Sequence, residues 1–209
     1  MRFIRPARAG LGLAAAALFI SACGQAQAGS AIVWDSGRVT DNELAEQTQV
    51  LIDEFQVPAS PELTQFTITR LAQNVVVEEA AAREGVTVSD GEVERATAEL
   101  VAEYGGEEEL TAFLAEQGVP RSELETQVRT SLLFQAITEK VDPNYDPMAG
   151  SQLANDLLVQ TSSDISLATN PRFGVWDPSR LTVVPDPNEL SRPGDNDLAL
   201  SPQQLPPSQ

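Results

Sequence analysis

The residue with the most distinctive chemistry in this chain is Cys23, the single cysteine among 209 residues. A thiol is the best nucleophile that a protein offers for forming a thioether, and its reactive form is the thiolate. Catalysis by a cysteine needs a neighbouring general base, and the sequence contains no histidine to act as one. A single cysteine also excludes a disulfide within the chain, so the folded state depends on packing alone. Cys23 is therefore a candidate for covalent modification rather than for catalysis.

The residues that precede Cys23 have the organisation of a secretory signal. Three arginines give a positively charged start, namely Arg2, Arg5 and Arg8. The run over 9–20 is almost wholly apolar, but it is too short for a membrane-spanning helix, which needs roughly 20 residues. We therefore expect this segment to direct export and to be removed before the protein folds.

The signal ends in Ile-Ser-Ala-Cys at positions 20–23, an aliphatic residue, two small residues and a cysteine. This order resembles the lipobox of bacterial lipoproteins. The resemblance implies that 1–22 is a lipoprotein signal peptide and that Cys23 carries a diacylglyceryl group and an N-acyl chain. Such a lipid would anchor the protein at the extracytoplasmic face of the cell membrane. The alternative is a chance cysteine beside an ordinary signal that is cleaved near Ala28.

Other side chains that could catalyse a reaction lack suitable partners. The carboxylates of Glu78 and Glu79, and those of the acidic run 107–109, are adjacent in sequence, so on a helix they point in different directions. The single lysine, Lys140, is expected at a helix C-terminus, where a cation interacts favourably with the helix dipole. The chain has neither a Gly-x-x-x-x-Gly-Lys phosphate loop nor a Gly-x-Ser-x-Gly nucleophile elbow. We therefore expect no enzymatic activity.

The net charge of the chain indicates which classes of partner it can bind. The net charge of −18 becomes −21 when the signal, with its three arginines and no acids, is removed. Such a surface repels nucleic acid and anionic lipid headgroups, so neither is an expected partner. Without histidine, and without an Asp-x-[Asp/Asn]-x-[Asp/Asn]-Gly calcium loop, we expect no metal and no cofactor besides the lipid. The acidity fits either a solvated surface or a cradle for basic segments of a client.

The segment that follows Cys23 is expected to hold the folded part close to the membrane. Residues 24–30 are small and polar, and with Cys23 they form a lipidated tether over 23–30 that reaches at most about 25 Å. The short apolar run at 31–34 contains two β-branched residues and predicts a strand. The Asp-Ser-Gly sequence at 35–37 predicts a turn.

Five helices are then predicted from caps and apolar periodicity. Capping-box sequences at 40–43 and 89–92 and a Ser-Pro pair at 60–61 begin three of them. Three consecutive valines at 75–77 lower helix propensity, which predicts that their helix is buried on more than one side. Apolar residues recur at helical spacing, and proline or glycine ends each stripe. The predicted helices cover about 41–57, 61–85, 90–104, 107–118 and 121–140.

The remaining chain has weaker patterns. A further helix is predicted over 149–160, and the alternation of polar and apolar residues over 164–169 predicts a half-buried strand. From Asp177 onward the last 33 residues contain seven prolines and little periodicity. This composition predicts a disordered tail over 177–209.

Several of these segments, in this order, resemble the N-terminal chaperone module of SurA- and PrsA-type extracytoplasmic foldases. Together the matching segments span about 31–140. The sequence Asn-Pro-Arg-Phe-Gly-Val-Trp-Asp at 170–177 is similar to the C-terminal end of the same module in actinobacterial lipoproteins. The segments that carry the resemblance are Gly-Arg-Val-Thr-x-x-Glu-Leu at 37–44, Gly-Val-Thr-Val-Ser-Asp-Gly-Glu-Val at 85–93, Phe-Leu-Ala-Glu-Gln-Gly at 113–118 and the closing helix at 123–133.

The resemblance implies a mainly α protein, a multi-helix module over 31–176 in which a small two-stranded β element joins the chain ends. In that element the segment 164–169 would pair with 31–34. Full foldases carry a parvulin-type isomerase domain between the long helix and the closing segment. Only 141–163 lies there in this chain, and it contains no histidine, so isomerase activity is not expected.

In a module of this type, unfolded clients are held by apolar and aromatic side chains within a polar rim. We expect most aromatic residues to lie in the core and one or two to project into a client groove. The candidates are Phe55, Phe66, Tyr104, Phe113 and Phe134. The expected function is that of a membrane-anchored holdase for exported or unfolded polypeptides. The alternative is a structural or adaptor lipoprotein that docks one folded partner of the cell envelope.

Overall fold

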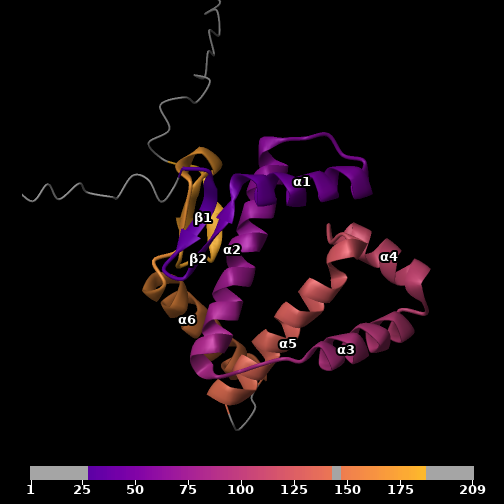
Figure 1. Ribbon diagram of the computed structural model, residues 1–209. Coiled ribbons are helices and arrows are strands. Elements are labelled where there is room, and N and C mark those ends of the chain that lie inside the picture. Colours follow the sequence, from indigo (N-terminus) through magenta and orange to yellow (C-terminus); the bar gives the residue numbers. More distant parts are fainter. Residues whose placement is uncertain (1–27, 143–146, 187–209) are drawn as a thin grey trace, which may run out of the picture.

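The computed structural model of the chain describes residues 28–142 and 147–186. Cys23 and the signal 1–22 lie outside the described residues. Within the described ranges the protein is mainly helical, as the sequence predicts, with six α-helices and five short strands (Figure 1). None of the described helices combines the length and the apolar character that crossing a membrane requires.

The folded part begins with a β-hairpin, of which the sequence predicts only the first strand. β1 (Ser30–Trp34) pairs antiparallel with β2 (Gly37–Thr40). Gly37 suits the turn because a Cβ at this position would lie 2.5 Å from Cζ2 of Trp34. The Trp34 indole donates from Nε1 to Oε1 of Glu79, at 2.8 Å. This hydrogen bond ties the hairpin to a helix 45 positions further along the chain.

A third strand joins the two ends of the folded part, as expected. β3 (Ala168–Thr169) pairs antiparallel with β1, which gives the strand order β2-β1-β3. The sheet has three strands where two are predicted, because β2 occupies the other edge of β1. β3 is also shorter than the predicted 164–169, because the preceding helix α6 (Pro147–Asp164) continues to Asp164 and Ile165 packs into the core.

Local capping signals set the starts of the first two helices. α1 (Asp41–Phe55) begins with a capping box: the Glu43 backbone N–H donates to Thr40 Oγ1 at 3.2 Å, and the Thr40 N–H donates to Glu43 Oε2 at 2.6 Å. These hydrogen bonds favour the ionised carboxylate and lower the pKa of Glu43. α2 (Pro61–Glu84) begins after the N-cap Ser60 and has proline in its first turn, as predicted.

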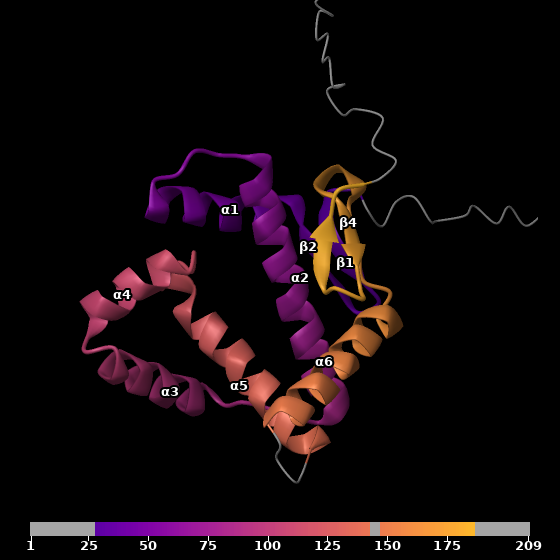
Figure 2. The ribbon, with the colours of Figure 1, turned by 180° about the vertical axis from the view of Figure 1, so that it is seen from behind.

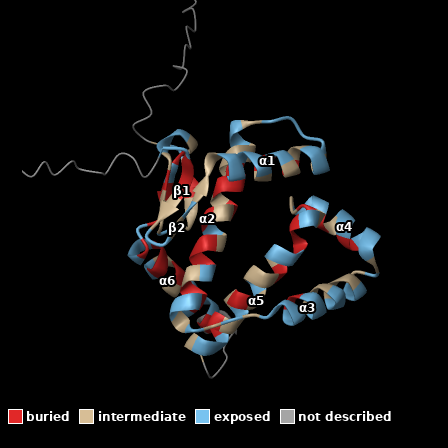
Figure 3. Cartoon of the chain, viewed as in Figure 1, coloured by how far each residue is buried: buried red, intermediate tan, exposed pale blue. Residues whose placement is uncertain are grey.

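α2 is the central helix of the protein. It packs against α1, α5 (Leu124–Val141) and α6. The consecutive valines Val75, Val76 and Val77 are all buried, in agreement with the prediction from their low helix propensity. Figure 3 shows buried residues along most of the length of α2. Burial on several sides supplies the packing that this stretch needs to remain helical.

The segment after α2 forms a helical arm, residues 90–128, with its own small core. Figures 1 and 2 show α3, α4, the 3-10 turn η2 and the first half of α5 projecting from the other elements, which we call the body. The bounds are Asp90–Glu103 for α3, Glu107–Glu116 for α4 and Arg121–Glu123 for η2. The arm core consists of Val93, Leu110, Leu114, Leu124 and Val128. The second half of α5 packs into the larger core of the body, so α5 connects the two.

A second hairpin closes the described chain. β4 (Val175–Asp177) pairs antiparallel with β5 (Thr182–Val184) and follows the 3-10 turn η3 (Pro171–Phe173). The sequence predicts disorder from Asp177 onward, and the structure differs from that prediction over 177–186. The remainder of the predicted disordered tail lies outside the described residues.

Two isolated apolar residues hold this hairpin on the body. The side chains of Trp176 and Val183, which are register partners, both belong to the body core. Trp176 is 6% exposed, and its Nε1 donates to Ser162 Oγ at 2.6 Å. Gly174 precedes the hairpin with φ +111°, and a Cβ there would lie 2.6 Å from the Val184 carbonyl oxygen. Such contacts leave no periodic pattern in the sequence, which explains why the hairpin is not predicted.

Candidate functional site

A largely apolar groove lies between α2 and α5, with a volume of about 380 Å³. Figures 1 and 2 show α2, α5 and α6 meeting at the base of the body. Leu181, in the turn between β4 and β5, also lines the groove. We call this surface the α2–α5 groove. It is lined by Arg70, Gln73, Asn74, Val76, Val77, Gln127, Thr130, Ser131, Phe134, Leu158 and Leu181.

The floor of the groove is apolar and packs into or against the body core. Val76, Val77 and Leu158 are buried in the body core, and Phe134 and Leu181 pack against that core while remaining partly exposed. An apolar floor of this kind can accept aliphatic side chains of a ligand.

The rim of the groove is polar but carries no carboxylate, although the chain has 31 acidic residues. Its residues are Gln73 and Asn74 from α2 and Gln127, Thr130 and Ser131 from α5. Thr130 Oγ1 approaches Asn74 Oδ1 at 3.4 Å. The side chains of Gln127 and Ser131 make no hydrogen bond to other described residues. The rim therefore offers uncharged donors and acceptors to a ligand.

A buried ion pair fixes the end of the groove nearest the arm. Arg70 Nη2 donates to Glu123 Oε1 at 2.8 Å, and the two side chains are only 9% and 11% exposed. Arg70 Nε has no hydrogen-bond partner among the described residues. Burial lowers the pKa of Arg70 from its ordinary value, but a guanidinium stays charged in proteins. The pair joins η2 to α2 across 53 positions of sequence.

A second contact between arm and body lies beside this pair. The backbone N–H of Arg121 donates to the Glu54 carboxylate at the end of α1, and Ser122 Oγ donates to the same carboxylate at 3.3 Å. The Arg121 guanidinium in turn binds Glu107 at 2.8 Å. Polar contacts thus hold η2 against α1 and α2.

The five aromatic residues predicted as candidates for a client groove lie in different parts of the structure. Phe134 lines the α2–α5 groove. Tyr104 and Phe113 contact each other in the arm, with ring centroids 4.5 Å apart, and Phe55 lies in the last turn of α1. Phe66 is 46% exposed. Most were expected in the core, but none is buried: Phe66 is exposed and the other four are partly exposed.

The sequence interpretation misses the polar residues of the rim. One signal was available: Gln65, Thr69 and Gln73 are uncharged polar residues spaced four apart in a predicted helix. On α2 these three side chains share one face, and Gln73 reaches the groove. The partners from α5 could not be found in this way, because their alignment with α2 is tertiary.

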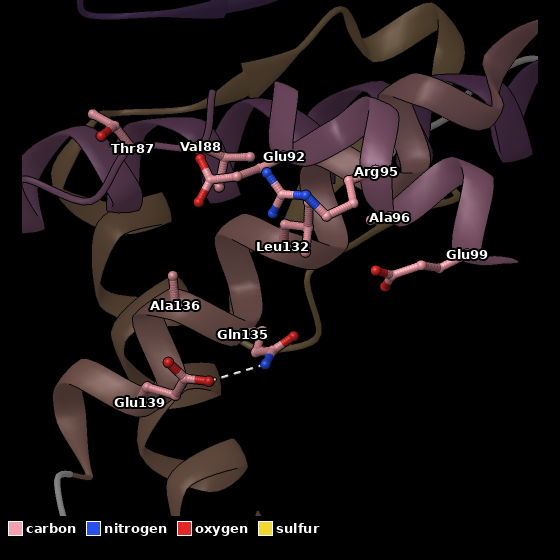
Figure 4. A pocket seen from close by; sticks show the side chains of 10 residues that line it. All are labelled: Thr87, Val88, Glu92, Arg95, Ala96, Glu99, Leu132, Gln135, Ala136 and Glu139. Carbon is pink, nitrogen blue, oxygen red and sulfur yellow. Dashed lines mark hydrogen bonds between the residues drawn. The ribbon is translucent and has the colours of Figure 1, made fainter. Parts of the chain in front are cut away.

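A second pocket lies between α3 and α5 and has a different character. Figure 4 shows its side chains, with Gln135 donating to Glu139 at 2.9 Å along α5. Its volume is about 280 Å³, and it is lined by three carboxylates, those of Glu92, Glu99 and Glu139, together with Arg95. Glu92 also completes the cap of α3, which lowers its pKa. This pocket resembles the general acidic surface, whereas the α2–α5 groove does not.

Two of the side chains considered for catalysis, those of Lys140 and Glu79, have structural partners. Lys140 Nζ lies 3.3 Å from Glu84 Oε2 in the last turn of α5. Glu79 accepts from Trp34. Across 28–142 and 147–186, no three acidic or cysteine side chains gather in a way that could hold a metal ion.

Comparison of the chain with models of protein families, with curated proteins and with solved structures finds no match.

Proposed function

We propose that this protein is a membrane-anchored, extracytoplasmic holdase that binds exported or unfolded polypeptides and has no isomerase activity. The observation that supports this proposal best is the α2–α5 groove, which has an apolar floor and a polar rim without carboxylates in a strongly acidic protein. A segment of unfolded chain offers the matching chemistry, because it exposes aliphatic side chains and unpaired backbone groups.

The volume of the groove and the net charge of the protein agree with weak binding of clients that differ in sequence. A volume of about 380 Å³ is near the lower end of ligand sites and holds only a short stretch of chain. A small contact favours release, which a holdase requires. The net negative charge of the protein would keep a complex with an unfolded client soluble, because like charges repel other complexes.

The resemblance to the chaperone module of SurA- and PrsA-type foldases supports the same proposal. The predicted pairing of the segments 31–34 and 164–169 is present as β1 and β3. A structural or adaptor lipoprotein needs a surface that matches one folded partner, and an open apolar groove favours the holdase over this alternative.

The proposal is tested with the mature protein made soluble, in an assay of aggregation. Several unrelated proteins are diluted from denaturant, and light scattering is followed with the chaperone at near-stoichiometric ratios. We expect suppression for each client. An adaptor would suppress none of them and would instead capture one dominant partner from envelope extracts, which would overturn the proposal.

The membrane anchor is tested separately by Cys23→Ser. Because the hydroxyl does not form the thioether, we expect the variant to leave the membrane fraction while the wild-type chain remains there. Suppression of aggregation by the purified variant should equal that of the delipidated wild-type chain. A variant that stays in the membrane fraction after a high-salt wash would refute anchoring through Cys23.

A further inference from the structure

The structure contains one extended segment that is already bound by polar side chains of α2. β5 pairs with β4 along one edge, and its other edge faces α2 rather than a third strand. Gln65 Nε2 donates to the Val183 carbonyl oxygen at 3.1 Å, and the Val183 N–H donates to Thr69 Oγ1 at 3.2 Å. Gln73 Nε2 donates to the Leu181 carbonyl oxygen at 2.8 Å. Uncharged side chains thus satisfy the backbone groups that a neighbouring strand would otherwise satisfy.

These three side chains form a regular row. Gln65, Thr69 and Gln73 are spaced four apart, so they follow one face of α2. The next position in the row is Val77, which is 6% exposed and forms part of the floor of the α2–α5 groove. The surface that holds β5 is therefore continuous with the groove, and Gln73 and Leu181 belong to both.

The groove repeats the chemistry that holds β5. Its rim carries the same kinds of side chain, carboxamide and hydroxyl, at Asn74, Gln127, Thr130 and Ser131. Those of Gln127 and Ser131 make no hydrogen bond to other described residues, so they are available to a ligand. The partial exposure of Phe134 beside them provides an apolar contact of the kind that Val183 finds in the body core.

We infer that the α2–α5 groove binds an extended polypeptide segment by its main chain, with Gln127 and its rim neighbours hydrogen-bonding backbone amides as Gln65, Thr69 and Gln73 do for residues 181–183. This inference rests on the proposed function and specifies its ligand. Recognition of the main chain explains how clients of different sequence bind in one site. The side chains of the client need only include aliphatic residues for the floor.

The test uses a short labelled peptide of alternating valine and threonine and the same peptide methylated on alternate backbone nitrogens. Binding to the full Cys23→Ser chain is followed by fluorescence anisotropy. Methylation removes N–H donors and leaves the side chains unchanged, so we expect it to weaken binding about tenfold, the effect of losing one or two hydrogen bonds. A peptide with the same residues in shuffled order should bind within about threefold of the first.

A substitution in the rim connects this effect to the groove. Gln127→Met keeps the length of the side chain and removes its hydrogen-bonding groups, and we expect it to reduce the methylation effect. Gln135→Met, on the same helix but in the α3–α5 pocket, should leave the effect unchanged. Equal binding of methylated and unmethylated peptides, or an equal methylation effect in both variants, would overturn main-chain recognition. Aggregation of client proteins could still be suppressed in that case, so the two proposals fail separately.

Discussion

Glu123→Ala is expected to lower the free energy of unfolding by about 3–5 kcal/mol, because it leaves the buried Arg70 guanidinium without its counter-charge. Arg70 cannot lose its proton at accessible pH, and its Nε already lacks a partner among the described residues. The variant would also release η2 from α2, so the arm should be the first part to exchange its amide hydrogens. Urea unfolding followed by circular dichroism gives the energy.

Two controls separate the ion pair from other effects of the substitution. Glu125→Ala removes an exposed carboxylate two positions along the chain and should change stability by less than about 0.5 kcal/mol. The double variant Arg70→Met with Glu123→Leu removes both charges and should recover most of the lost stability. Equal unfolding midpoints for Glu123→Ala and Glu125→Ala would show that the pair does not join arm to body.

Trp176→Ala is expected to cost a similar amount, about 3–5 kcal/mol, because the indole is 6% exposed and fills the body core beneath the second hairpin. Truncation leaves a cavity and also leaves Ser162 Oγ without its donor. Because the turn of the same hairpin contributes Leu181 to the α2–α5 groove, the loss should extend to client binding.

Two further substitutions separate the contribution of the Trp176 hydrogen bond to stability from the contribution of its apolar packing. Trp176→Phe keeps most of the apolar contact and loses the hydrogen bond to Ser162, so we expect a cost of about 1–2 kcal/mol. Val175→Ala, at an exposed position of the same strand, should be close to neutral. Thermal unfolding of the three variants side by side provides the comparison. An unchanged midpoint for Trp176→Ala would mean that the hairpin is not part of the folded core.

The helices could be predicted from the sequence because their signals are local. The capping boxes at Thr40 and Ser89 and the Ser-Pro start at Ser60 each lie within four residues of the helix that they begin. The short strands β2 and β5 could not be predicted in this way. β2 is only four residues long and pairs with β1, and β5 depends on partners distant in sequence, as the hydrogen bond from Gln65 to Val183 shows.

The candidate site was less predictable than the fold for the same reason. Apolar periodicity places Phe134 on a buried face, but it does not indicate that α2 and α5 leave a groove beside it. The Arg70–Glu123 pair joins residues 53 positions apart, and neither has a sequence signal for the other. The absence of carboxylates from the rim depends on which residues of α2 and α5 face each other in the folded protein, so it has no signal in the sequence.

The most direct test of the holdase proposal is a comparison of two variants in the aggregation assay. Ser131→Glu places a carboxylate on the rim of the α2–α5 groove, and Thr126→Glu adds the same charge to an exposed position of α5 that does not line the groove. A client's aliphatic side chains would desolvate the new rim carboxylate, so Ser131→Glu should need about tenfold more protein for the same suppression, equivalent to about 1.4 kcal/mol. Thr126→Glu should match the parent chain. Equal suppression by both variants would contradict a holdase that works through this groove.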